Sequence, residues 1–187
     1  MGYIIFGSLS FVFFYLFDYL NDKGKQSIKI ISALTGLIVI ICGTIGIATL
    51  EERSLGSTGF IFIYLILALF FLLALVYSLF LELPFNKTYG GEDFHTGLIT
   101  TGTYSLCRHP GVLWFFFMYL FYGLYLSSEM MLLACFIWTG LDVVYVILQE
   151  KYFFVKNFSD YGKYQKSTPM LIPNIKSIRR FIESPRL

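Results

Sequence analysis

Five long runs of apolar residues, separated by short polar segments, dominate the chain. They cover residues 3–20, 28–50, 59–83, 111–126 and 130–154. A helix needs about 20 apolar residues to cross about 30 Å of hydrocarbon, so the second, third and fifth runs are long enough and the first is marginal. The fourth is short, and only residues 127–129 separate it from the fifth, which predicts a tight helical hairpin. The pattern predicts an all-α, polytopic transmembrane bundle of about five spans.

Composition agrees with the membrane class, because 57% of the 187 residues are hydrophobic and only 14% are charged. The first apolar run has no basic segment before it and no obvious small-residue cleavage site, so we interpret it as a retained span rather than a signal peptide. We expect one membrane domain over residues 1–187. Residues 1–83 would hold the first three spans, and residues 84–187 a loop, the hairpin and a C-terminal tail.

The distribution of Lys and Arg predicts the orientation of the spans. If the N-terminus lies outside, only Arg53 of the 14 basic residues falls in an outside segment. This is a strong positive-inside bias. It predicts a multi-pass protein with the 84–110 loop, the C-terminal tail and any active site on the cytoplasmic side.

The end of the tail has the pattern of a short amphipathic helix. In NIKSIRRFIE, residues 174–183, three isoleucines are spaced to share one face, opposite Lys176, Arg179 and Arg180. Such a helix is suited to lie on an anionic leaflet. A solvated C-terminal helix is the alternative interpretation.

Three polar residues near the ends of the hairpin, together with a proline, are candidates for chemistry. Pro110 suits the first helical position, and the N–H groups at a helix start favour an anion, as does Arg108 beside them. His109 supplies an imidazole, which can donate or accept a hydrogen bond. Glu150 lies near the end of the fifth run, and the hairpin would bring it to the same side as Arg108 and His109. The alternatives are an interfacial arginine, a capping histidine and a solvated glutamate.

Asp142 lies in the middle of the fifth run, with Tyr145 and Gln149 on the same helical face. A carboxylate at that depth faces protein or water, so it marks either a functional site or a polar clamp between helices. In the loop before the hairpin, His95 follows two acidic residues, but the three are too closely spaced for a metal site. We therefore expect no metal, and the three cysteines have no redox or metal spacing.

The segments TGTYSLCRHP, QE and FSDYGKYQKSTPMLIP, with two apolar helices between the first and second, resemble a known family over about residues 97–173. The pattern is similar to that of the integral-membrane isoprenylcysteine carboxyl methyltransferases and the related phospholipid methyltransferases. The matching positions are Gly102, Tyr104, Arg108, His109, Pro110, Glu150, Tyr161, Tyr164 and Pro173. Val112, Trp114 and Gln149 stand where the family usually has Tyr, Gly and Glu.

The resemblance implies a methyltransferase that uses S-adenosylmethionine and a lipid or prenylated, lipid-like acceptor. The cofactor site would be formed by the last two helices and the tail. The implied cofactor-binding residues are Gly102, Tyr104, Arg108, His109, Pro110, Glu150, Tyr161 and Tyr164. Arg108, His109 and Glu150 are also the implied catalytic residues: the first would hold the cofactor carboxylate, the second orient the cofactor or act as a base, and the third hold its amine or favour its sulfonium.

Two other functions remain open from the sequence. A membrane reductase of the steroid-reductase type would use NADPH, but it would need more basic groups for the extra phosphate than the 84–110 loop offers. A non-catalytic membrane binding or transport subunit would be built around Asp142. The chain carries no nucleic-acid-binding motif, and no pattern specifies an oligomeric state.

Overall fold

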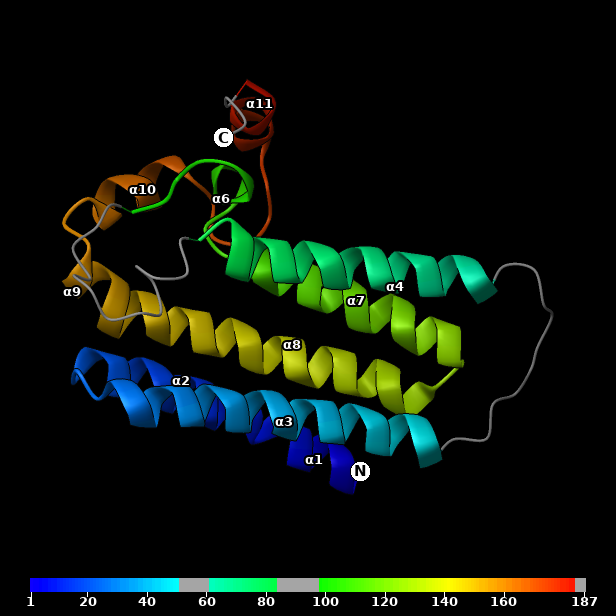
Figure 1. The fold of residues 1–187 in the computed structure, drawn as a ribbon. Helices are drawn as coiled ribbons and strands as arrows, with labels where there is room; N and C mark the ends of the chain where they lie inside the picture. The colour runs from blue at the N-terminus through cyan, green and yellow to red at the C-terminus, as the bar shows by residue number, and fades with distance from the viewer. Residues whose placement is uncertain (51–60, 84–97, 184–187) are drawn as a thin grey trace.

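The computed structural model describes residues 1–50, 61–83 and 98–183, and these residues form helices with no strand among them. Long helices lie side by side, and the short C-terminal helices gather at one end (Figure 1). Within these described ranges, four helices are long and apolar enough to cross a membrane: Gly2–Asp22, Ser27–Leu50, Phe62–Leu81 and Glu129–Asn157. The expected all-α polytopic bundle is confirmed.

The first span is divided into α1 (Gly2–Ser8) and α2 (Ser10–Asp22), which meet at Leu9. Near the break, the carbonyl of Ile4 accepts hydrogen bonds from the Ser8 hydroxyl, at 2.9 Å, and from the Trp138 indole N–H, at 3.0 Å. Side chains that bond into the helical ladder are a known cause of bends. These bonds tie α1 to the centre of the bundle.

The hairpin consists of α7 (Pro110–Leu126) and the longer α8 (Glu129–Gln149). At 17 residues α7 is about 25 Å long, so the fourth run is short, as expected. Ser127 has a left-handed conformation with φ of 52°, and the Ser128 side chain accepts the N–H of Met131 at 2.9 Å. These are standard ways to end one helix and begin the next.

The central helix is α8, which packs between α7 on one side and α1, α2 and α3 (Gln26–Leu50) on the other (Figure 1). Trp138 of α8 is fully buried, and the ring of Tyr119 meets it edge-on at 5.1 Å. The Tyr119 hydroxyl is 2.7 Å from Thr44 Oγ1 of α3. The core therefore joins the hairpin to the N-terminal spans.

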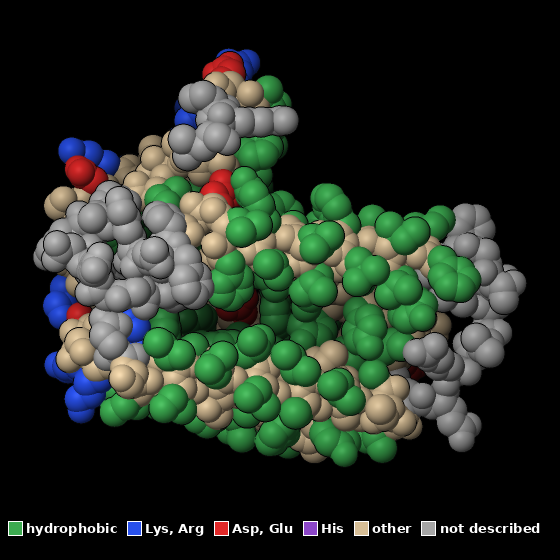
Figure 2. Space-filling model, in the orientation of Figure 1, with side chains coloured by type: hydrophobic (Ala, Val, Ile, Leu, Met, Phe, Trp, Pro, Cys, Tyr) green, Lys and Arg blue, Asp and Glu red, His purple; other side chains and the backbone are tan. Residues whose placement is uncertain are grey.

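On the far side of α7 lies α4 (Ile61–Val76), which continues as a π-helical turn, η1 (Tyr77–Leu81). Phe71 of α4 stacks against Trp114 and Phe117 of α7, with ring centroids 6.0 and 5.0 Å apart. The outer faces of the long helices remain apolar: Leu73, for example, is 68% exposed. Figure 2 shows hydrophobic side chains along the whole length of the visible face, as a lipid-facing surface requires.

The chemistry-bearing segments share one end of the bundle. There, η1 ends, α7 begins, and α8 continues into a second π-helical turn, η2 (Glu150–Phe154), and α9 (Val155–Asn157). The short helices α6 (Thr103–Leu106), α10 (Tyr161–Ser167) and α11 (Ile175–Glu183) surround this end (Figure 1). Lys and Arg side chains gather at the same end (Figure 2). That this end faces the cytoplasm stays a prediction from the charge bias.

Candidate functional site

The carboxylate of Glu150 is the centre of a buried polar cluster. Its Oε1 accepts from Arg108 Nε at 2.7 Å and the Tyr161 hydroxyl at 2.9 Å, and lies 2.8 Å from His109 Nε2. Its Oε2 accepts from Arg108 Nη2 at 3.1 Å and Gln165 Nε2 at 2.9 Å. The hairpin thus brings Arg108, His109 and Glu150 together, as the sequence predicts, and α10 adds two more donors. Glu150 begins η2, and such π-helical turns often occur at functional sites.

Arg108 and Glu150 form a two-point ion pair, and each side chain is only 10% exposed. Burial alone would lower the pKa of the Arg108 guanidinium, but its hydrogen bonds to Glu150 and the attraction of that charge outweigh burial and raise the pKa. Burial, followed by the negative charge of Glu150, raises the pKa of Tyr161. Arg108 therefore stays charged, and Tyr161 stays a hydrogen-bond donor.

The C-terminal tail forms part of this site. The backbone N–H groups of Arg108 and His109 donate to the carbonyls of Pro169 and Met170, at 2.9 and 3.1 Å. Arg108 Nη1 also donates to the carbonyl of Thr168 at 2.7 Å. The tail is consequently held against the start of α7 by both backbone and side-chain bonds.

His109 is the residue immediately before α7, and Pro110 occupies the first turn, as expected from its fixed backbone angle. The imidazole stacks on Phe154, with ring centroids 6.1 Å apart and an interplanar angle of 12°. To donate to an ionised Glu150, Nε2 must carry the proton, which leaves Nδ1 of a neutral ring as an acceptor. The stacking and the hydrogen bond together fix the ring orientation.

Three of the sequence-predicted residues support the cluster rather than join it. The Tyr164 hydroxyl donates to the carbonyl of Tyr104 at 2.6 Å, and the Tyr104 hydroxyl donates to the carbonyl of Ser78 in η1 at 3.1 Å. Gly102 has φ of 57°, and a Cβ at this position would collide with the Glu82 carboxylate. These contacts hold α6 between η1 and α10. A direct role in cofactor binding stays a prediction for these residues.

A second polar cluster joins α2 to α8 and includes Gln149, the residue immediately before Glu150. Asp18 Oδ2 accepts from the Tyr145 hydroxyl and from Gln149 Nε2, both at 2.7 Å. The sequence predicts that Asp142 marks either a functional site or a polar clamp between helices. In the structure, the carboxylate that clamps α2 to α8 is that of Asp18. Within the described part of the chain, Asp142 has no hydrogen-bond partner.

Sequence reasoning missed Gln165, Phe154 and Asp18. A signal existed for the first two. Gln165 comes four residues after Tyr161, and Phe154 four residues after Glu150, so each shares a helical face with a predicted site residue. Asp18 stands out as an acidic residue at the end of an apolar run, but its partners are 127 and 131 residues away in the chain. No local pattern points to them.

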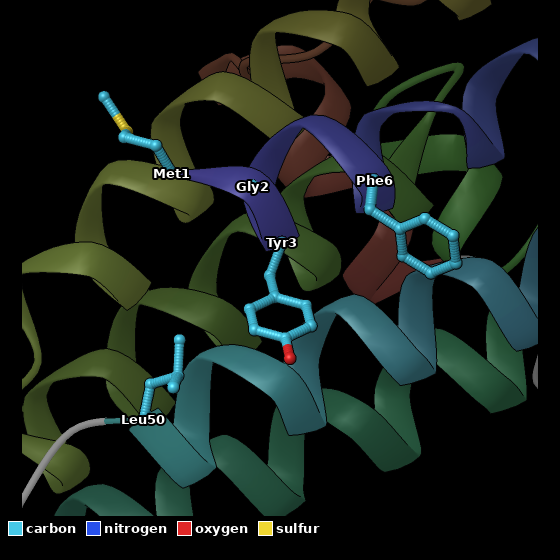
Figure 3. Close-up of a pocket in the computed structure, with 5 residues that line it drawn as sticks. All are labelled: Met1, Gly2, Tyr3, Phe6 and Leu50. Carbon is cyan, nitrogen blue, oxygen red and sulfur yellow. The ribbon is translucent and has the colours of Figure 1, made fainter.

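The described residues contain no group of three or more His, Cys, Asp or Glu that could hold a metal ion, and His95 lies outside them. An apolar hollow of about 380 Å³ lies at the end of α3 and the start of α1, lined by Met1, Gly2, Tyr3, Phe6 and Leu50 (Figure 3). This end of the bundle is opposite the Glu150 cluster (Figure 1). A separate recess between α4 and α3, with hydrophobic walls and an acidic side chain at its floor, is visible in Figure 2.

No family model and no solved structure matches the chain. A curated protein that it resembles is the nickel-cobalt-cadmium resistance protein NccN of Alcaligenes xylosoxydans xylosoxydans, which is 33% identical over 86 residues. The match covers 45% of this chain and 39% of NccN, so the chain spans about two fifths of that relative's length. The name assigns metal resistance to NccN.

Proposed function

We propose that the protein is an integral-membrane methyltransferase that uses S-adenosylmethionine and acts on a lipid or lipid-modified acceptor. The observation that carries the proposal is the Glu150 cluster: a buried carboxylate, a guanidinium and an imidazole at one end of an apolar bundle. The resemblance of residues 97–173 to the isoprenylcysteine and phospholipid methyltransferases supports the same function.

The donor set of the cluster fits the cofactor chemically. The carboxylate of the cofactor would require a cation, which Arg108 supplies. Arg108 has five N–H groups, of which four donate to described residues. The amine or sulfonium of the cofactor would require a negative charge, which Glu150 supplies. The adjacent rings of Phe154 and Tyr161, with centroids 5.5 Å apart, offer flat apolar faces for adenine or the sulfonium. Because Arg108 and Glu150 already bind each other, such a ligand would compete with that ion pair.

When bound, S-adenosylmethionine supplies an activated methyl group. The chain itself would contribute mainly position and charge, since direct displacement depends strongly on alignment of the reactants. Arg108 and Glu150 would orient the charged groups, while Phe154 keeps the His109 ring in place. His109 Nδ1 is suited to accept a proton from an acceptor hydroxyl or amine, whereas a carboxylate acceptor needs no base.

Access from the bilayer is the second requirement of a lipid acceptor. The apolar recess between α4 and α3 supports it, because it opens on the hydrophobic side of the bundle (Figure 2). A prenyl or acyl chain could remain in apolar surroundings there while its polar end approaches the end of α8.

Calorimetric titration of the purified protein in detergent with S-adenosylhomocysteine tests the proposal, with NADPH titrated in parallel. We expect the first ligand to bind, and His109→Asn and Tyr161→Phe to weaken binding about tenfold or more each, since each loses a hydrogen bond to the Glu150 carboxylate. Asp22→Asn, which removes an exposed ion pair with Lys156, is the matched control. Binding of NADPH alone would favour the reductase, and binding of neither by folded protein would favour a binding or transport subunit around Asp142.

A role in metal resistance is a second candidate, and the match to NccN is the observation that favours it. Such a role would not use a metal site of His, Cys, Asp and Glu in the described residues, which contain none. Expression in a metal-sensitive host, followed by growth on nickel, cobalt or cadmium, tests it. Increased tolerance that is lost in His109→Asn would place the role at the Glu150 cluster. Unchanged tolerance would count against this candidate.

A further inference from the structure

The C-terminal helix α11 is short but well defined at its start. The Asn174 side chain accepts the N–H of Ser177 at 2.8 Å, and the Ser177 hydroxyl accepts the N–H of Asn174 at 3.0 Å. This reciprocal arrangement is a capping box, and Pro173 precedes it. Ser177 is fully buried, and α11 packs against α6. The orientation of the helix is therefore determined by these contacts.

Once α11 is docked, two neighbouring faces of it remain uncovered. One is apolar: Ile175 is 82% exposed and Ile182 is 76% exposed. The other carries Lys176 and Arg179, which are also exposed. Two isoleucines left in water lose the hydrophobic stabilisation that burial provides, so an apolar partner would stabilise this face of the helix.

The position of α11 suggests which partner this is. Figure 1 shows α11 crossing the direction of the long helices, at the end of the bundle where α4 ends. In Figure 2 the hydrophobic side chains of this projecting part lie on the side turned toward the apolar length of α4, and its charged side chains lie at the outer edge. An in-plane helix at the surface of a bilayer has this arrangement.

We propose that α11 binds the anionic surface of the leaflet that surrounds this end of the bundle. Ile175 and Ile182 enter the boundary of the acyl chains, while Lys176 and Arg179 pair with lipid phosphates and carboxylates. Basic residues near an anionic surface are each stabilising, and the two faces match the two layers of the leaflet. The inference does not depend on the proposed enzymatic activity.

Binding at α11 would be transmitted to the Glu150 cluster. Arg180 Nη1 donates to Thr168 Oγ1 at 3.3 Å, and Arg180 Nη2 donates to the carbonyl of Ser167. The carbonyl of Thr168 in turn accepts from Arg108 Nη1. A leaflet-bound α11 therefore stabilises the tail segment that holds Arg108 in place.

Hydrogen–deuterium exchange of the full chain in nanodiscs tests the proposal. One set contains phosphatidylcholine alone and the other contains phosphatidylcholine with phosphatidylserine. We expect the amides of residues 174–183 to exchange about tenfold to thirtyfold more slowly with phosphatidylserine, because each of two basic residues contributes about fivefold. The double variant K176Q/R179Q should lose this difference, and added salt should reduce it.

The matched control is K163Q/K166Q, which removes two exposed charges from the neighbouring helix α10 and leaves α11 intact. This variant should keep most of the protection by phosphatidylserine. Equal exchange of α11 in the two lipid compositions would overturn the proposal. Equal loss of protection in both double variants would also overturn it, since the tail would then respond only to its total charge.

Discussion

Replacing Glu150 by Gln removes a charge from the centre of the polar cluster while keeping the shape of the side chain. The Glu150 carboxylate accepts from four side chains through five contacts, and two of these come from the guanidinium of Arg108. A glutamine oxygen can replace one carboxylate oxygen, but its NH₂ group would then face donors at the other. Arg108, which is 10% exposed, would also lose its counter-charge. Breaking one side of a buried ion pair costs about 3 to 5 kcal/mol.

The loss of the Arg108–Glu150 ion pair should appear first as release of the C-terminal tail from the start of α7. Cys107 precedes Arg108 and is fully buried, and burial raises the pKa of its thiol to about 12. In the folded protein this thiol should therefore react very slowly with a maleimide at pH 8, since it is both covered and protonated. If release of the tail exposes it, a loss of about 3 kcal/mol raises the alkylation rate about 150-fold.

Mass spectrometry of the alkylated peptides measures the alkylation rates of Cys107 and Cys135 in one sample. Cys135 is buried in the hairpin core, so its reactivity should not change in Glu150→Gln. The matched control is Asp22→Asn, which breaks an exposed ion pair at the same end and should cost less than about 1 kcal/mol. Equal Cys107 reactivity in Glu150→Gln and Asp22→Asn would refute the conclusion that the Arg108–Glu150 pair holds the tail.

Two further predictions concern the supports of the cluster. Gly102→Ala should lower the thermal unfolding temperature in detergent by several degrees, because the φ of Gly102 is positive and the new methyl group collides with Glu82. The control is Gly162→Ala, which should leave the unfolding temperature nearly unchanged because nothing lies within 4 Å of the added Cβ. A double-mutant cycle of Asp18→Asn and Tyr145→Phe should show a coupling energy of about 0.5 to 1.5 kcal/mol in unfolding measurements, and additive effects would mean that their 2.7 Å bond contributes nothing.

Local patterns in the sequence determined the elements of this protein. Runs of apolar residues predict the long helices because a helix in lipid satisfies its own backbone groups, whatever its neighbours are. Pro110 marks the start of α7, and the residues between the fourth and fifth runs predict a tight hairpin. The spacing of the isoleucines three and four residues apart, with basic residues between them, predicts α11. The hairpin alone was enough to predict that Glu150 lies near Arg108.

Only the tertiary structure decided which partners complete the site. The tail carbonyls that bind Arg108 and the amide of Gln165 that binds Glu150 belong to segments whose docking depends on packing at the end of the bundle. The pairing of Asp18 with Tyr145 likewise depends on how α2 packs against α8. An apolar periodicity is nearly the same all round a lipid-facing helix, so it carries little information about which face meets which neighbour. The contacts between distant segments are therefore specified only by the tertiary packing.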